Sequence, residues 1–234
     1  MPLTELPLGV VSWLALVGLG GVLALDAVSW PQAMVSRPLV SGTVGGWVLG
    51  DPEAGFLVGA LLELLSLRFP PFGATRYPDA GPAGLIAGAA YAGAGGSDLA
   101  ALVTALIAGW AVGWIGSASV HWRRQLNARL LAPADALAAD PRRLERRHRL
   151  AALVDGSRGA LLTAGFLLPA VVAAALAAGG ATGVGATTLG AAALVTSLAV
   201  AAGAGGRTVS FGLRGWPLLL VGAVLGALLA GVLP

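Results

Sequence analysis

The sequence predicts an all-α integral membrane protein that crosses the bilayer several times. We expect short re-entrant or broken helices in its N-terminal third, followed by about four or five spanning helices. Of the 234 residues, 57% are hydrophobic and only 11% are charged. Soluble domains carry about 25% charged residues, so this chain has too few charges to cover a water-exposed surface. Its 36 glycines and 14 prolines interrupt the apolar runs, and nine of the prolines lie within the first 98 residues.

The first part of the chain contains apolar runs that are short for a membrane span. Residues 8–25 carry no charge, and their length is near the lower limit for crossing a bilayer, about 20 residues. The runs at 39–49, 54–67 and 83–94 are shorter still. Broken backbone at membrane depth is tolerated only where protein or a water-filled cavity surrounds it. We therefore expect this region to form a site rather than a set of plain anchors.

The later segments are more ordinary candidates for spanning helices, at residues 99–120, 159–178, 184–202 and 216–233. The sequence accordingly predicts two regions. Residues 1–98 form an N-terminal membrane region with broken helices and the binding site. Residues 99–234 form a region of spanning helices that includes a basic cytoplasmic loop at 121–149.

The positive charge is concentrated in that loop. All fourteen basic residues are arginine, and eight of them lie within residues 121–149 against three acids. Arginine-rich loops stay in the cytoplasm, so the loop fixes an orientation. The loop is interpreted either as a topology determinant or as a docking surface for a soluble partner or anionic membrane lipid. The high isoelectric point describes this loop and not a nucleic-acid-binding face, and we expect no nucleic acid partner.

Catalytic and metal chemistry find little support in the sequence. There is no cysteine, which excludes disulfides, zinc–thiolate sites and cysteine nucleophiles. The two histidines lie within the basic loop. No serine–histidine or histidine-cluster arrangement is present, so we expect no catalytic residue, no metal and no cofactor.

Ionisable residues in membrane segments are costly and are treated as functional candidates. Glu63 is the strongest because leucines surround it within residues 54–67. Gly55, Gly59 and Glu63 are spaced to fall on one helix face, where small residues let a second helix approach. Glu63 is then expected to point into protein. The alternative role is a buried ion pair, for example with Arg37, Arg68 or Arg76.

Three further acids border the short segments. Asp51 stands between glycine and proline, which predicts an N-cap. Asp79 is an N-cap or a ligand-binding group, and both interpretations stay open. Asp26 leads into a stretch with Gln32, whose amide offers the donor and acceptor that sugar hydroxyls need. The alternative for that stretch is helix capping.

The order and spacing of these residues resemble the IIC membrane subunit of mannose-type (mannose/fructose/sorbose) sugar phosphotransferase systems. The resemblance covers about the first ninety residues. It rests on Ser36-Arg37-Pro38-Leu39-Val40, Gly50-Asp51, Gly55, Gly59, Glu63-Leu64, Gly73-Ala74 and Pro78-Asp79.

The resemblance implies a multi-pass protein of the bacterial inner membrane that binds and translocates a hexose-type sugar. It would work in a hetero-oligomer with a IID membrane subunit, while soluble IIA and IIB subunits carry the phosphate to the sugar. The implied substrate-binding residues are Asp26, Gln32, Glu63, Gly73, Ala74 and Asp79. Two alternatives are a substrate-binding subunit of a different small-molecule uptake transporter and a diverged membrane scaffold without transport.

Overall fold

The computed structural model describes residues 8–29, 31–67, 77–131 and 140–180. Their regular structure is entirely helical, which confirms the predicted fold class. The predicted segments at 184–202 and 216–233 lie outside the described residues, and the division at residues 98 and 99 stays a prediction. The six described helices are α1 (Val10–Val28), α2 (Pro38–Val48), α3 (Pro52–Ser66), α4 (Ala80–Gly93), α5 (Leu99–Leu131) and α7 (Pro141–Gly180).

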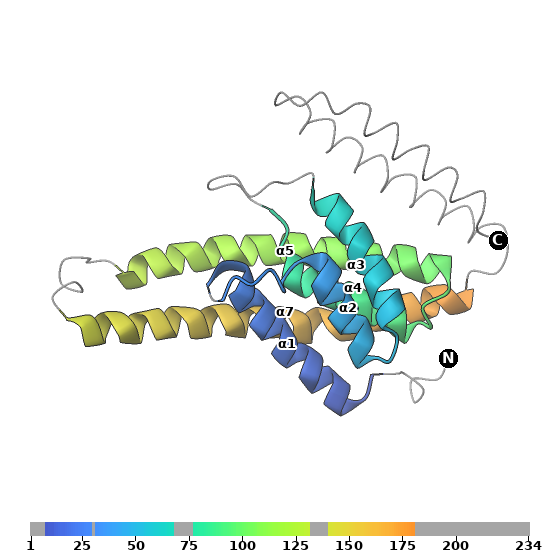
Figure 1. Ribbon diagram of the computed structural model, residues 1–234, viewed down its shortest axis with the longest axis horizontal. Helices are drawn as coiled ribbons and strands as arrows, with labels where there is room; N and C mark the ends of the chain where they lie inside the picture. Colours follow the sequence, from blue (N-terminus) through green and yellow to red (C-terminus); the bar gives the residue numbers. More distant parts are fainter. Residues whose placement is uncertain (1–7, 30, 68–76, 132–139, 181–234) are drawn as a thin grey trace, which may run out of the picture.

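Three of these helices, α1, α5 and α7, are long and apolar enough to cross a membrane. α5 has 33 residues and α7 has 40. At ~1.5 Å per residue they are ~50 and ~60 Å long, well beyond the ~30 Å hydrocarbon core. The two helices run side by side, and α1 packs obliquely against α7 (Figure 1). One end of the α5–α7 pair must therefore extend out of the bilayer.

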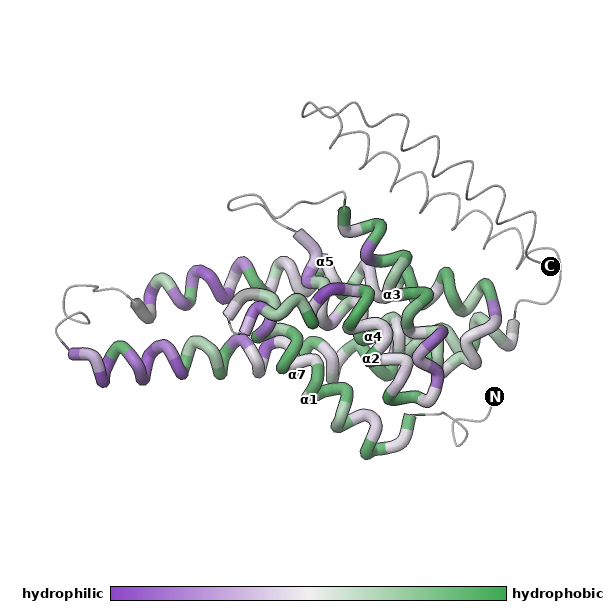
Figure 2. Tube along the Cα trace, viewed as in Figure 1, coloured by the Kyte–Doolittle hydropathy of each residue, from purple (hydrophilic) through white to green (hydrophobic). Residues whose placement is uncertain are grey.

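That end carries the arginines, and it corrects the prediction of a loop at 121–149. Residues 121–131 continue α5 and residues 141–149 begin α7; together we call them the basic arm. Figure 2 shows the arm as the most hydrophilic part of both helices. Asp140 Oδ1 accepts the backbone N–H groups of Arg142 and Arg143, with Pro141 at the first helical position. Arginine, leucine and alanine are good helix formers, so the arm is helical although it is too polar for the bilayer.

The helices α2, α3 and α4 have 11, 15 and 14 residues. At ~1.5 Å per residue none exceeds ~23 Å, so each is too short to cross the ~30 Å core alone. A tight turn at Gly50, whose φ of +90° favours glycine, joins α2 to α3. Asp51 then caps α3 by accepting the N–H of Ala54 at 2.9 Å, as predicted. The broken helices of the N-terminal third are thus a helical hairpin followed by a single short helix.

Glycines bring these short helices into backbone contact. A Cβ added to Gly42 of α2 would lie 2.8 Å from the Cα of Gly59 on α3. A Cβ added to Gly55 would lie 2.8 Å from the Cα of Gly46. Neither position has room for a side chain, so α2 and α3 approach as closely as their backbones allow. The predicted role of the Gly55 and Gly59 face is therefore confirmed.

The centre of the fold is α4, which is buried from Gly81 to Ala92. It contacts α1, α2, α3, α5 and α7. A helix that is apolar on every side belongs inside a bundle, and the small alanine and glycine side chains of α4 let five neighbours reach it. Leu85 and Ile86 supply the larger side chains of this core and are fully buried.

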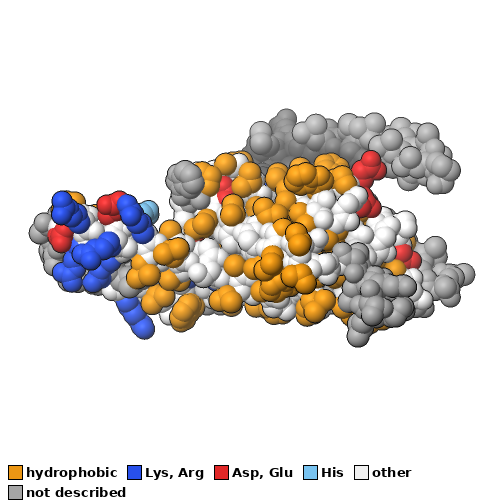
Figure 3. Space-filling model, turned by 90° about the horizontal axis from the view of Figure 1, so that it is seen from below, with side chains coloured by type: hydrophobic (Ala, Val, Ile, Leu, Met, Phe, Trp, Pro, Cys, Tyr) orange, Lys and Arg blue, Asp and Glu red, His pale blue; other side chains and the backbone are white. Residues whose placement is uncertain are grey.

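Outside the basic arm, the surface of the described residues is mostly apolar, although a few polar side chains such as Gln32, Arg37 and Glu53 are also exposed. Figure 3 shows hydrophobic side chains over most of one face and arginines gathered at one end. Large exposed side chains include Val11, Trp47, Leu161 and Leu176. In water such a surface would cause aggregation, whereas in a membrane it contacts lipid or other subunits.

Candidate functional site

Asp26, near the end of α1, folds the segment that follows it. Its Oδ1 accepts the N–H of Ala33 at 2.6 Å, and its Oδ2 accepts the N–H of Ser36 at 2.9 Å. The residue is only 2% exposed. These two bonds bend residues 31–36 back toward α1 and place the start of α2 directly after the bend. In this structure the carboxylate binds backbone rather than standing free.

Gln32 and Met34 lie within this bend with positive φ angles of 59° and 63°. Such angles are uncommon for residues other than glycine, and because they cost free energy they persist only where the surrounding structure enforces them. Both side chains are exposed. The bend therefore presents the amide of Gln32 outward on a backbone that Asp26 holds in place.

Glu63, near the end of α3, meets the same segment from the other side. Its Oε1 lies 3.2 Å from Nη1 of Arg37, and its Oε2 accepts the N–H of Leu39 at 3.4 Å. Glu63 thereby caps the N-terminus of α2, where the free N–H groups favour an anion. Its side chain is 22% exposed and that of Arg37 is 49% exposed. An ion pair with Arg37 therefore forms, but it is not the buried pair of the alternative prediction, and both groups remain accessible.

Asp79 occupies the N-cap position of α4 without making the side-chain bond of a cap. Its Oδ2 instead accepts from Nη1 of Arg158 on α7 at 2.5 Å. Its backbone N–H donates to Gly113 of α5 at 2.8 Å. The two predicted roles of Asp79, an N-cap and a ligand-binding group, did not include this ion pair. With 2% of its side chain exposed, Asp79 can reach a ligand only if the pair opens.

The Asp79–Arg158 pair belongs to a larger buried cluster of polar groups. Asp155 is fully buried on α7, 3.4 Å from Nε of Arg158 and 3.4 Å from Nε of Arg123 on α5. Asp155 also accepts from Ser29 at the end of α1, at 2.6 Å. Two carboxylates and two guanidinium groups thus balance in charge and join α1, α4, α5 and α7.

Sequence reasoning missed this cluster, which we call the charge cluster and define as Asp79, Arg123, Asp155 and Arg158. Hydropathy placed Asp155 and Arg158 just before the predicted span at 159–178 and counted Arg123 within the loop. The available signal was the i, i+3 spacing of Asp155 and Arg158, which puts both side chains on one face of a helix.

Three of the predicted substrate-binding residues converge on one segment. Asp26 and Glu63 bind neighbouring parts of residues 33–39, and Gln32 lies in the bend between α1 and α2. Asp79 is held apart from them by its pair with Arg158, although α4 itself lies close to the start of α2. Gly73 and Ala74 lie outside the described residues. The accessible polar groups of the site are those of Gln32, Arg37 and Glu63.

Comparison with known proteins places this geometry in context. The family model described as the sorbose-specific IIC component of the phosphotransferase system matches residues 8–204. The chain is 35% identical over 74 residues to the sorbose-specific EIIC component of Lacticaseibacillus casei. That match covers 32% of this chain and 24% of the relative. It is also 33% identical over 87 residues to the mannose-specific EIIC component of Escherichia coli K12, covering 37% of this chain and 30% of the relative.

Two solved structures share the fold. One, described as a membrane protein, has a TM-score of 0.63 at 20% identity and covers 96% of this chain and 95% of its own. The other is the mannose transporter ManYZ in complex with microcin E492. Its TM-score is 0.55 at 19% identity, with 94% of this chain and 87% of that chain covered. At these identities the likeness is one of fold.

Proposed function

Because the chain belongs to the sorbose-specific IIC family of phosphotransferase-system membrane components, we propose that it binds a hexose-type sugar and translocates it across the membrane. It is a multi-pass membrane protein of this bacterial family. The observation that carries the proposal is that Asp26 and Glu63 both bind residues 33–39, next to Gln32 in the bend between α1 and α2.

The accessible groups suit the chemistry of a sugar. Glu63 offers carboxylate oxygens that accept from hydroxyls, Arg37 offers donors, and the amide of Gln32 offers both. Charged partners make these hydrogen bonds stronger than those between neutral groups. Sugar hydroxyls that replace part of the 3.2 Å contact between Arg37 and Glu63 would keep both ions satisfied. We assign direct contacts to Gln32 and Glu63, and Asp26 holds the bend that positions them.

Translocation is proposed to occur by movement of the binding region formed by the short helices. Glycine contacts hold α2 against α3 and bring α2 equally close to α4, so the three short helices are packed as one unit. A rigid-body shift of such a unit exposes a bound polar substrate first to one side of the membrane and then to the other. Asp79 would contribute if its pair with Arg158 opens during this shift.

The proposed partners are a IID membrane subunit and soluble IIA and IIB subunits. Phosphoryl transfer to the sugar is assigned to IIB, and this chain is a transport component without a catalytic residue. The basic arm extends from the membrane on the side assigned to the cytoplasm, where a soluble subunit would dock. The exposed apolar faces of α2 and α3 offer contact surface to a membrane partner.

The test is sugar binding by the chain in membranes together with its IID partner, using a panel of labelled hexoses and amino sugars. Glu63→Gln and Gln32→Ala are expected to weaken binding of the accepted sugar by about tenfold or more, because each removes a direct hydrogen bond. Failure of every sugar to bind the native complex would overturn the proposal.

Glu53→Gln provides the matched control. Glu53 is an exposed acid in the first turn of the same helix α3, at the end opposite Glu63. The control removes the same charge and should leave binding unchanged. Equal losses from Glu53→Gln and Glu63→Gln would indicate a general charge effect and remove Glu63 from the site.

A further inference from the structure

A crevice between α5 and α7 lies outside the candidate sugar site. It has a volume of about 480 Å³. On α5 it is lined by Ser119, Trp122 and Arg123. On α7 it is lined by Val154, Ser157, Arg158, Leu161, Leu162 and Phe166. Two arginines of the charge cluster thus border a cavity whose remaining walls are mostly apolar.

Each arginine keeps one buried N–H without a hydrogen-bond partner. Among the described residues, four buried side-chain polar atoms lack such a partner. Two of them are Nη2 of Arg158 and Nε of Arg123, and the latter lies 3.4 Å from Asp155 in an ion pair without the geometry of a hydrogen bond. The arginine side chains are only 9% and 8% exposed. Buried donors on a charged group are costly when unsatisfied, so an acceptor is expected beside them. The carboxylates of Asp79 and Asp155 are already occupied by the contacts described above.

The cavity is polar at one end and apolar at the other. Arg123, Arg158 and Ser157 lie toward the basic arm, whereas Leu161 and Phe166 lie farther along α7 toward the middle of the membrane. From Arg158 to Phe166 the helix rises by ~12 Å. Trp122, 61% exposed at the polar end, is the side chain expected at a membrane–water interface.

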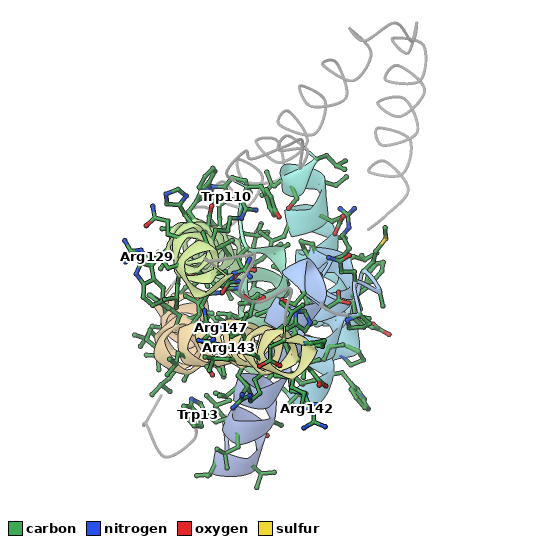
Figure 4. All side chains as sticks on the ribbon, turned by 90° about the vertical axis from the view of Figure 1, so that its left-hand side faces the viewer. Trp13, Trp110, Arg129, Arg142, Arg143 and Arg147 are labelled. Atoms are coloured by element: carbon green, nitrogen blue, oxygen red, sulfur yellow. The ribbon has the colours of Figure 1, made fainter. Side chains whose placement is uncertain are left out.

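We propose that this crevice binds an anionic phospholipid of the cytoplasmic leaflet. The lipid phosphate sits at Arg123 and Arg158, and an acyl chain lies along Leu161, Leu162 and Phe166. A small soluble anion would leave the long apolar wall without a contact, whereas an acyl chain would cover it. Figure 4 shows Arg129, Arg142, Arg143 and Arg147 around the near ends of α5 and α7. This positive charge would attract negatively charged headgroups to the crevice. The inference is independent of which sugar the protein transports.

The experiment is lipid binding to the purified full-length chain, measured by native mass spectrometry with phosphatidylglycerol and with zwitterionic phosphatidylcholine. Phosphatidylglycerol should bind about tenfold more tightly, and Arg123→Gln should remove most of that preference. Arg129→Gln is the matched control, because Arg129 is exposed on the same helix and does not line the crevice. It should change the affinity less than twofold.

A second pair of variants tests the apolar wall without disturbing the buried cluster. Leu161 and Leu176 are exposed leucines of α7, 73% and 63% respectively, and only Leu161 lines the crevice. Leu161→Ser should weaken phosphatidylglycerol binding several-fold, and Leu176→Ser should not. This comparison remains decisive if Arg123→Gln fails to fold.

Three results would overturn the proposal. Equal losses from Arg123→Gln and Arg129→Gln would indicate diffuse attraction by the basic arm. Displacement of the lipid by millimolar inorganic phosphate would assign the site to a soluble anion. Equal affinity of the native chain for the two lipids would show that the arginines do not distinguish an anionic headgroup from a zwitterionic one.

Discussion

The buried ion pair between Asp79 and Arg158 makes the protein's stability sensitive to substitution of either residue. Their contact is 2.5 Å and both side chains are nearly fully buried. Removing one partner leaves a buried charge without compensation, and this loss exceeds what the pair contributes when intact. The accessible pair of Arg37 and Glu63 is screened by solvent and should matter far less to stability.

Asp79→Asn and Arg158→Gln are each expected to lower the free energy of unfolding by ~3–5 kcal/mol. The double variant should lose less than the sum of the two, because no unpaired charge then remains in the pair. Arg37→Gln serves as the exposed comparison and should cost ~1 kcal/mol or less. Denaturant unfolding in detergent or bilayers measures all four. Additive losses would show that the two side chains do not interact.

The positive φ angles of Gln32 and Met34 allow stability and binding to be separated. Glycine adopts such angles without strain, so Gln32→Gly and Met34→Gly should each leave stability unchanged or raise it by up to ~1 kcal/mol. Only Gln32→Gly should weaken sugar binding, because only Gln32 carries the amide assigned to the sugar. Loss of binding in both variants would point to the shape of the bend instead.

Among the helices and their contacts, the sequence predicts correctly those features that depend on residues close together in the chain. The cap at Asp51 and the glycine face at Gly55 and Gly59 depend on neighbours three or four residues away. Within the charge cluster, Asp79 and Arg158 are 79 residues apart, and no local pattern predicts that contact. Hydropathy alone predicts a loop at residues 121–149, whereas the N-cap at Asp140 and the proline at position 141 start a helix there. Hydropathy detects helices by their apolar runs, and a polar helix outside the membrane contains no such run.

The contact between α2 and α3 predicts a sharp difference between two glycines. A Cβ on Gly59 would lie 2.5 Å from the carbonyl oxygen of Pro38, whereas a Cβ on Gly18 of α1 would meet nothing within 4 Å. Gly59→Ala should therefore lower the free energy of unfolding by ~1–3 kcal/mol and impair transport. Gly18→Ala should be neutral or raise it by up to ~1 kcal/mol. Thermal unfolding and sugar uptake measure the two effects, and equal behaviour of the variants would contradict the close approach.

For the whole molecule, the orientation can be tested directly because the chain contains no cysteine. Ser97, between α4 and α5, and Arg142, in the basic arm, are both exposed and lie near opposite ends of the α5–α7 pair. In intact cells a membrane-impermeant maleimide should label Ser97→Cys and spare Arg142→Cys. After permeabilisation both should react. The reverse pattern would place the basic arm outside and remove the proposed docking side.

The charge cluster also has a consequence for how the protein is made. Asp79 emerges from the ribosome 79 residues before Arg158. At ~5–20 residues per second, its buried carboxylate waits ~4–16 s for its partner. During that interval α4 carries an uncompensated acid at its N-terminus and has no α7 to pack against. Helices α1 to α4 therefore cannot reach their final positions in the membrane until α7 has been synthesised.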